Sequence, residues 1–260
     1  MKRSTKIGLL LVLAVLLISI GYKAYEYRDT WIPYISGPAP IDDKYEEQRP
    51  EKITPAEEIT PAEEITPAEE IAPVPLGQVV FLGDSITYRW DMPEEIGTYR
   101  TINQGIDGNH TVSMVLRFRD DVLDLHPDRV VILGGINDIL NAAQYDVIFL
   151  DLHLEQTADN IRVMTRLAKK SSIEPILCSV LPVAANFRLP PEAINQSVQK
   201  LNASIEEIAG QEKVEYLDLW PGMVDPDTQM LKDDYATEDG IHLTPRGYEA
   251  MLQAFTEVLD

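Results

Sequence analysis

Residues 79–87 read Val-Val-Phe-Leu-Gly-Asp-Ser-Ile-Thr, and this stretch decides the fold class. Its first four residues form an apolar, β-branched run with the length of a buried strand. A glycine and small polar residues end the run, and Ser85 lies among them. In a parallel sheet, reactive groups gather just beyond the carboxyl ends of the strands. Ser85 is therefore a candidate nucleophile at the end of a first strand.

Strand and helix patterns alternate through the rest of the chain. Four more short apolar runs are typical of strands, at residues 101–103, 129–133, 175–181 and 214–219. Apolar residues recur at helical spacing within residues 112–123, 154–167, 198–208 and 251–258. Such alternation indicates right-handed crossovers and a parallel sheet covered on both faces. We therefore predict an α/β fold, a three-layer α/β/α sandwich.

The segments after the predicted strands supply the groups that acyl transfer needs. The block after the second strand contains Gly108, and the block after the third contains Asn137. Beyond the last strand, Asp239 precedes His242 by three residues. A hydroxyl, an imidazole, a carboxylate, a backbone amide and a side-chain amide would then meet at one edge of the sheet. Together they are the groups of a serine acyl-transfer site.

Each residue type has a role in that chemistry. His242 is the expected general base for Ser85, and Asp239, one helical turn before it, is expected to bond its other ring nitrogen. The backbone amides of Ser85 and Gly108 and the side-chain amide of Asn137 are the candidate oxyanion donors. Gly108 carries no Cβ, so its backbone could approach a substrate closely.

These four blocks resemble those of the SGNH hydrolases, the GDSL-type lipase and acylhydrolase family, over residues 78–260. The family's serine, glycine, asparagine and histidine fall on Ser85, Gly108, Asn137 and His242, with Asp239 as the acid. The resemblance implies a five-stranded parallel sheet of flavodoxin-like order. It also implies esterase, lipase, thioesterase or carbohydrate acetylesterase activity. The sequence departs from the family at Asn109-His110, which makes His110 a candidate residue of the substrate pocket.

Other polar residues have an ordinary structural interpretation. His126 and His153 are expected at helix ends, Asp84 in a turn and Trp90 in the core. The single cysteine, Cys178, lies in an apolar run and is expected to be buried. One thiol and four scattered histidines lack the spacing of a metal site. We therefore expect no metal and no cofactor.

The first 76 residues indicate a membrane address followed by a linker. Basic residues precede an uncharged, mostly apolar segment at residues 7–22, which predicts a membrane anchor within residues 1–35. A cleaved signal peptide is the alternative, although no small-residue cleavage site follows. Residues 36–76 hold three copies of Ile-Thr-Pro-Ala-Glu-Glu and predict an extended linker. Residues 77–260 are the predicted hydrolase domain.

The combined prediction is a serine ester hydrolase that removes small acyl groups, chiefly acetyl, from carbohydrate or related esters. By the positive-inside rule the domain lies outside the cytoplasm, anchored to the membrane or secreted if the first segment is cleaved. Three alternatives stay open: an O-acyltransferase acting on an envelope glycan, a lysophospholipase or thioesterase, and an inactive glycan-binding module. The expected partners are a small ester or acylated glycan and the membrane. A formal net charge of −21 argues against nucleic acid.

Overall fold

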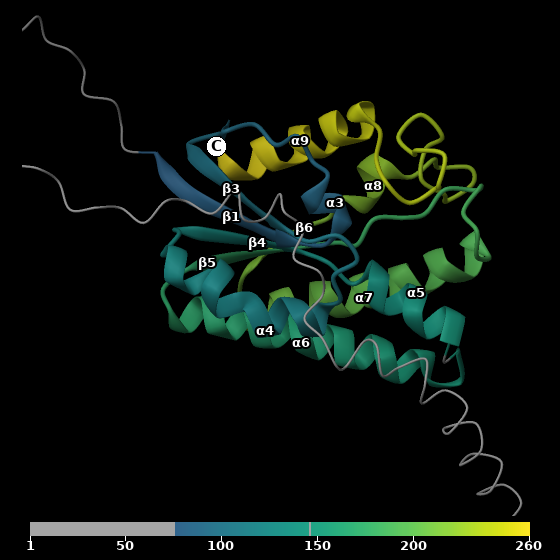
Figure 1. Cartoon of the computed structure of the whole chain (residues 1–260), viewed down its shortest axis with the longest axis horizontal. Helices are drawn as coiled ribbons and strands as arrows, with labels where there is room; N and C mark the ends of the chain where they lie inside the picture. The colour runs from purple at the N-terminus through teal and green to yellow at the C-terminus, as the bar shows by residue number, and fades with distance from the viewer. Residues whose placement is uncertain (1–75, 146) are drawn as a thin grey trace, which may run out of the picture. The chain divides into compact units, whose positions relative to one another are not determined.

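The apolar run at residues 79–82 forms the middle of strand β1, Gly77–Gly83, in the computed structural model (Figure 1). The structure describes residues 76–145 and 147–260. Apart from Leu76, the predicted anchor and linker lie outside these residues. No helix within the described ranges has the length and hydropathy needed to cross a bilayer.

The sheet has six strands in the order β2-β3-β1-β4-β5-β6. Besides β1, the parallel strands are β3 (Tyr99–Gly105), β4 (Arg129–Leu133), β5 (Glu174–Cys178) and β6 (Glu215–Leu217). These five have the predicted flavodoxin-like order. All five predicted parallel strands are present, and β2 (Glu95–Ile96), which was not predicted, adds an antiparallel edge to β3. Two residues are too few to show a period in the sequence.

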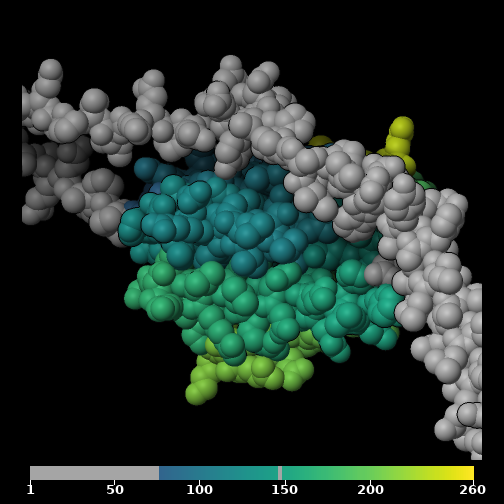
Figure 2. Space-filling view, turned by 60° about the horizontal axis from the view of Figure 1, so that its bottom comes forward, coloured from purple at the N-terminus to yellow at the C-terminus, as the bar shows by residue number. Residues whose placement is uncertain are grey.

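Helices cover both faces of the sheet, as predicted (Figure 1). One face packs against α4 (Thr111–Asp121), α5 (Ile136–Tyr145), α6 (Leu150–Lys170) and α7 (Pro191–Glu212). The other packs against α3 (Ser85–Tyr88), α8 (Trp220–Met223) and α9 (Pro245–Leu259). Two short 3₁₀ turns, η1 (Leu123–Leu125) and η2 (Val147–Phe149), complete the elements. Figure 2 shows the first layer from outside, passing from the teal of α4 to the green of α6.

Successive strand side chains point to opposite faces and so divide between two cores. In β1, Val80 and Leu82 belong to the core under α4–α7, whereas Val79 and Phe81 belong to the core under α9. All four side chains are at most 2% exposed. Burial on both faces explains why the central strands read as unbroken apolar runs.

Strand β5 is shorter than predicted. The apolar run continues to Leu181, but the strand ends at Cys178, which is 1% exposed. Beyond it, the Asn202 side chain of α7 accepts from the Val180 backbone N–H at 2.7 Å and donates to the Val180 carbonyl at 3.0 Å. A buried side-chain amide thus replaces the neighbouring strand as hydrogen-bond partner.

Candidate active site

Ser85 is the first residue of α3, and only Asp84 separates it from the end of β1. Asp84 caps the helix, because its carboxylate accepts the backbone N–H of Ile86 at 3.0 Å. The structural role predicted for Asp84 is thereby confirmed. Burial raises the pKa of Asp84 to about 7, against the lowering effect of the Ile86 hydrogen bond. Tyr248 of α9 fixes the same turn by donating to the Ile86 carbonyl at 2.9 Å.

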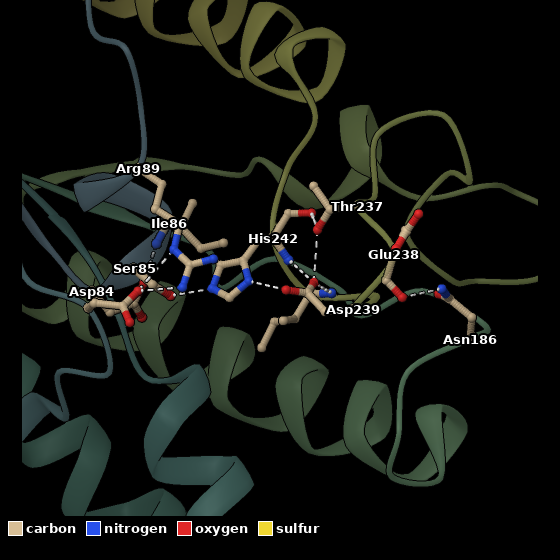
Figure 3. A network of polar contacts seen from close by, with 11 residues as sticks. Asp84, Ser85, Ile86, Arg89, Asn186, Thr237, Glu238, Asp239 and His242 are labelled. Atoms are coloured by element: carbon tan, nitrogen blue, oxygen red, sulfur yellow. Dashed lines mark hydrogen bonds and ion pairs between the residues drawn. The ribbon is translucent and has the colours of Figure 1, made fainter.

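His242 lies between Ser85 and Asp239 (Figure 3). Its Nε2 is 2.9 Å from the Ser85 hydroxyl, and its Nδ1 is 2.5 Å from Oδ2 of Asp239. The histidine comes from the loop that precedes α9, and its side chain is 15% exposed. When Nδ1–H donates to the carboxylate, Nε2 is left to accept the serine proton. The structure therefore brings the three predicted groups into one hydrogen-bonded chain.

The segment from Asp239 to His242 is a bend, whereas one turn of helix was predicted. Oδ1 of Asp239 accepts the backbone N–H groups of Ile241 and His242, each at 3.0 Å. Such side-chain to backbone bonds compete with helix and form an Asx-type turn. Gly240 has φ +75° within it, and a Cβ there would lie 2.7 Å from Oδ1 of Asn186. The bend thus requires glycine for both its conformation and its packing.

The Asp239 carboxylate is held in its ionised form. Burial raises its pKa, but hydrogen bonds from the His242 ring, from two backbone N–H groups and from Thr237 together hold it well below its usual range. The Thr237 hydroxyl contributes a bond of 2.9 Å. An ionised acid at this place stabilises an imidazolium. Thr237 was not predicted, because a lone threonine near an acid has no distinctive pattern.

The three candidate oxyanion donors follow the adjacent strands β1, β3 and β4. Within the described part of the chain, the backbone N–H groups of Ser85 and Gly108 have no hydrogen-bond acceptor. Gly108 has φ +71°, and a Cβ there would meet nothing within 4 Å, so conformation is the main reason for glycine. Asn137 donates one amide proton to the Asn109 carbonyl at 3.1 Å. Its second amide proton can be given to a substrate oxygen.

Asp138, for which no role was predicted, joins the first turn of α5 to the start of α4. Its carboxylate accepts from the backbone N–H and the hydroxyl of Thr111 at 3.0 and 2.8 Å. Burial raises its pKa, while the Thr111 bonds lower it. The start of α4, just after the loop that carries Gly108, is thereby fastened to the first turn of α5, which carries Asn137. His110 is the N-cap residue of α4, and its role in a substrate pocket stays a prediction.

The remaining expectations concern packing and helix ends. Trp90 is 5% exposed and stacks on Tyr248, so it belongs to the core as expected. His126 is the C-cap residue of η1, and His153 lies in the first turn of α6. Both histidines are therefore at helix ends, as expected.

A small hollow lies beside the nucleophile. Its lining includes both chain neighbours of Ser85 and the residues that precede Asn137 and His242. It has a volume of about 10 Å³. A space of that order holds roughly one water molecule. Its main lining side chains are Asp84, Ile86, Ile136, Val180, Leu181 and Ile241.

Comparison with known proteins decides the family. The model of the GDSL-like lipase/acylhydrolase family matches residues 81–250. The chain belongs to this family. As a GDSL-like acylhydrolase, the protein is a hydrolase of carboxylic esters. A GDSL-like lipase of Bacteroides thetaiotaomicron is 34% identical, with a TM-score of 0.58 over 70% of this chain and 87% of that one.

More distant relatives of this acylhydrolase include an acetylxylan esterase and a lipoprotein. The acetylxylan esterase of Geobacillus stearothermophilus has the same fold, with 20% identity and a TM-score of 0.57 over 70% of this chain and 94% of that one. The lipoprotein YqeF of Bacillus subtilis is 25% identical over 177 residues, which are 59% of this chain and 70% of the relative.

Proposed function

We propose that this acylhydrolase is a serine esterase that removes small acyl groups, chiefly acetyl, from carbohydrate or related esters outside the cytoplasm. One observation carries the proposal: the chain of hydrogen bonds from Ser85 through His242 to Asp239, at 2.9 and 2.5 Å. An imidazole held in this way can take the proton of a serine hydroxyl, which is a poor nucleophile without it.

The reaction proceeds in two halves. As Oγ of Ser85 bonds to the ester carbonyl carbon, its proton passes to Nε2 of His242. The imidazolium, paired with ionised Asp239, returns that proton to the departing alcohol oxygen as the C–O bond breaks. In the second half water attacks the acyl-serine, its proton passes through His242 back to Oγ, and the free acid leaves.

The carbonyl oxygen becomes negative in both halves and needs hydrogen-bond donors. We assign this role to the backbone N–H groups of Ser85 and Gly108 and to the side-chain amide of Asn137. Removal of one such donor typically raises the barrier by about 2.7–4 kcal/mol. The bond from Asn137 to the Asn109 carbonyl holds the amide in place before substrate arrives.

The hollow beside Ser85 favours a small acyl group. It is lined mainly by aliphatic side chains, and its volume of about 10 Å³ leaves no room for a long acyl chain. The similarity in fold to an acetylxylan esterase agrees with acetyl as the acyl group and with a carbohydrate as the alcohol.

The predicted anchor and the relative named a lipoprotein support a position at the outer side of a membrane. Residues 1–75 contain no cysteine, so the apolar segment at residues 7–22 would itself be the anchor. Protease that has access to the outer face of an intact cytoplasmic membrane should remove a C-terminal tag from the full-length chain. Digestion only after the cytoplasmic membrane is broken would contradict this location.

The test of the activity is an ester screen on the full-length chain. We expect it to release acid from p-nitrophenyl acetate faster than from the butyrate or octanoate ester, and to release acetate from acetylated xylo-oligosaccharides. Ser85→Ala should abolish both activities, whereas Ser204→Ala, at a partly exposed position of α7, should not. Turnover that survives Ser85→Ala would refute the mechanism. Transfer of acetyl to an added glycan in excess of hydrolysis would favour the acyltransferase alternative.

A further inference from the structure

Arg117 of α4 lies behind the candidate oxyanion donors, and its side chain is only 14% exposed. Its guanidinium donates to the Gly83 carbonyl at 2.8 Å and to the Gln104 carbonyl at 2.9 Å. These carbonyls lie at the carboxyl ends of β1 and β3. One planar group therefore ties together the two strand ends that lead into Ser85 and Gly108.

The same guanidinium reaches the third donor through Asn109. Nε of Arg117 donates to the Asn109 side-chain oxygen at 3.0 Å, and the Asn109 carbonyl accepts from Asn137 at 3.1 Å. Asn109 is also the direct chain neighbour of Gly108. Ser85 and Gly108 are thus within two residues of a residue that Arg117 bonds, and Asn137 donates to the backbone of one such residue, Asn109.

The charge of Arg117 is balanced within its own helix. Asp121, one turn later, accepts from the guanidinium at 2.6 Å and has a side chain that is 9% exposed. A buried cation without such a partner would be costly. The rigid fork of a guanidinium can satisfy four separate acceptors, which the single ammonium of lysine cannot do.

We propose that Arg117 is a positioning residue, which sets the geometry of the oxyanion donors without touching the substrate. The inference rests on the proposed function of Ser85, Gly108 and Asn137. Donor amides act on the transition state only when they lie at hydrogen-bond distance from the developing oxyanion. A misplacement of about 1 Å can cost on the order of 100-fold in rate. Loss of the Arg117 guanidinium would release the loop that carries Gly108 and that accepts the hydrogen bond of Asn137.

The first test is the kinetics of Arg117→Met in the full-length chain with p-nitrophenyl acetate. We expect kcat to fall about 100-fold while KM changes less than about threefold, because binding of the ground-state ester does not need the oxyanion contacts. Arg117→Lys keeps the positive charge but lacks the planar guanidinium, so its kcat should fall at least about tenfold. Wild-type kcat in both variants would overturn the proposal.

Arg129 provides the matched control. Its side chain is 20% exposed, and it bonds the Val258 carbonyl at 3.1 Å and pairs with Glu174. It begins β4, so it lies at the amino ends of the strands, opposite the site. Arg129→Met should lose stability, yet keep kcat per folded molecule within about threefold of wild type. An equal loss of kcat in Arg117→Met and Arg129→Met would show a general effect of removing a buried arginine and would overturn the proposal.

A double variant tests the route through Asn109. If Arg117 acts through that side chain, Asn109→Ala should lower kcat, and the double variant Arg117→Met/Asn109→Ala should be within about twofold of Arg117→Met alone. Losses that multiply would show that the two residues act separately, and would overturn this route.

Hydrogen exchange separates failure of this inference from failure of the proposed function. Arg117→Met should speed amide exchange in residues 104–110, whereas Arg129→Met should not. If Ser85→Ala kept full turnover while exchange changed as expected, the proposed function alone would be wrong and Arg117 would still position the loop. Unchanged exchange in residues 104–110 of Arg117→Met would overturn the inference itself.

Discussion

Asp239 holds His242 by both its ring and its backbone: one carboxylate oxygen lies 2.5 Å from Nδ1, and the other accepts the histidine N–H at 3.0 Å. The acid therefore fixes the tautomer of the imidazole and also the bend that carries it. Both tasks fall on one carboxylate three residues before the histidine, so a change at Asp239 affects the tautomer and the bend together.

Asp239→Asn should lower kcat for p-nitrophenyl acetate by about 10³–10⁴-fold. An amide can keep the backbone bonds, but it cannot stabilise an imidazolium, and it permits the wrong tautomer. Asp225→Asn is the control, because Asp225 likewise accepts local backbone and hydroxyl bonds, from Thr228. Asp225→Asn should keep kcat, and a loss below about tenfold in Asp239→Asn would contradict the assigned role.

Asn137→Ala should lower kcat by about 10²–10³-fold with little change in KM. The side-chain amide is assigned to the oxyanion, which exists only on the reaction path, so its loss affects the transition state. Steady-state kinetics of Asn141→Ala, one turn along α5, give the comparison. A rise in KM at constant kcat would instead make Asn137 a residue of substrate binding.

Leu181→Ala should shift the preference toward longer acyl chains. Leu181 is 5% exposed and lines the hollow, so the smaller side chain makes room beside Ser85. One methylene in an apolar pocket is worth about 10–200-fold in kcat/KM, so the ratio of butyrate to acetate turnover should rise at least about tenfold. Leu259→Ala removes an equally buried leucine near Thr98, at the amino end of β3, and should leave the ratio unchanged.

The Asp84→Asn variant should gain stability relative to the wild type as pH rises. Burial lifts the pKa of Asp84 from 3.8 to about 7, so the folded wild type binds an extra proton between these values and loses stability across this range. The asparagine variant does not lose stability in this way. The unfolding free energy of Asp84→Asn minus that of the wild type should therefore rise by at most about 4 kcal/mol between about pH 4 and 8. Urea titrations at several pH values measure it.

The direction of this pH effect can be checked on Asp225, a carboxylate whose pKa is lowered and not raised. Backbone bonds from Thr228 lower the pKa of Asp225, so that residue stabilises the fold above the unfolded pKa and loses its contribution as the pH falls through the folded value. Asp225→Asn should therefore become less stable relative to the wild type as pH rises through the acidic range in which the Asp225 carboxyl ionises. Equal slopes for the two variants would contradict the assigned shifts.

Much of the fold was predictable because a sheet that is buried on both faces has strands with unbroken apolar sequences. The five parallel strands and the helices α4, α6, α7 and α9 follow from apolar runs and from helical periodicity. Helix α5 was missed, since its first residues were interpreted only as the polar block after β4. The early end of β5 depends on Asn202, a residue far along the chain, and no local pattern reports such a partner.

The residues of the candidate site were predictable where they follow strands, and unpredictable where they act through other groups. Ser85, His242 and Asp239 were named from their blocks, and the structure brings them together. Arg117 left no signal, because an arginine four residues before an acid is common on exposed helices. Two of its four partners are backbone carbonyls, which every residue has.

The buried position of Cys178 has a consequence for handling and for survival in an oxidising medium. Burial raises the pKa of the thiol, and only thiolates exchange readily with disulfides. The single sulfhydryl of the chain is therefore shielded from oxidants and from cross-linking between copies. The folded enzyme should need no reducing agent during purification, and it suits a compartment in which exposed thiols do not persist.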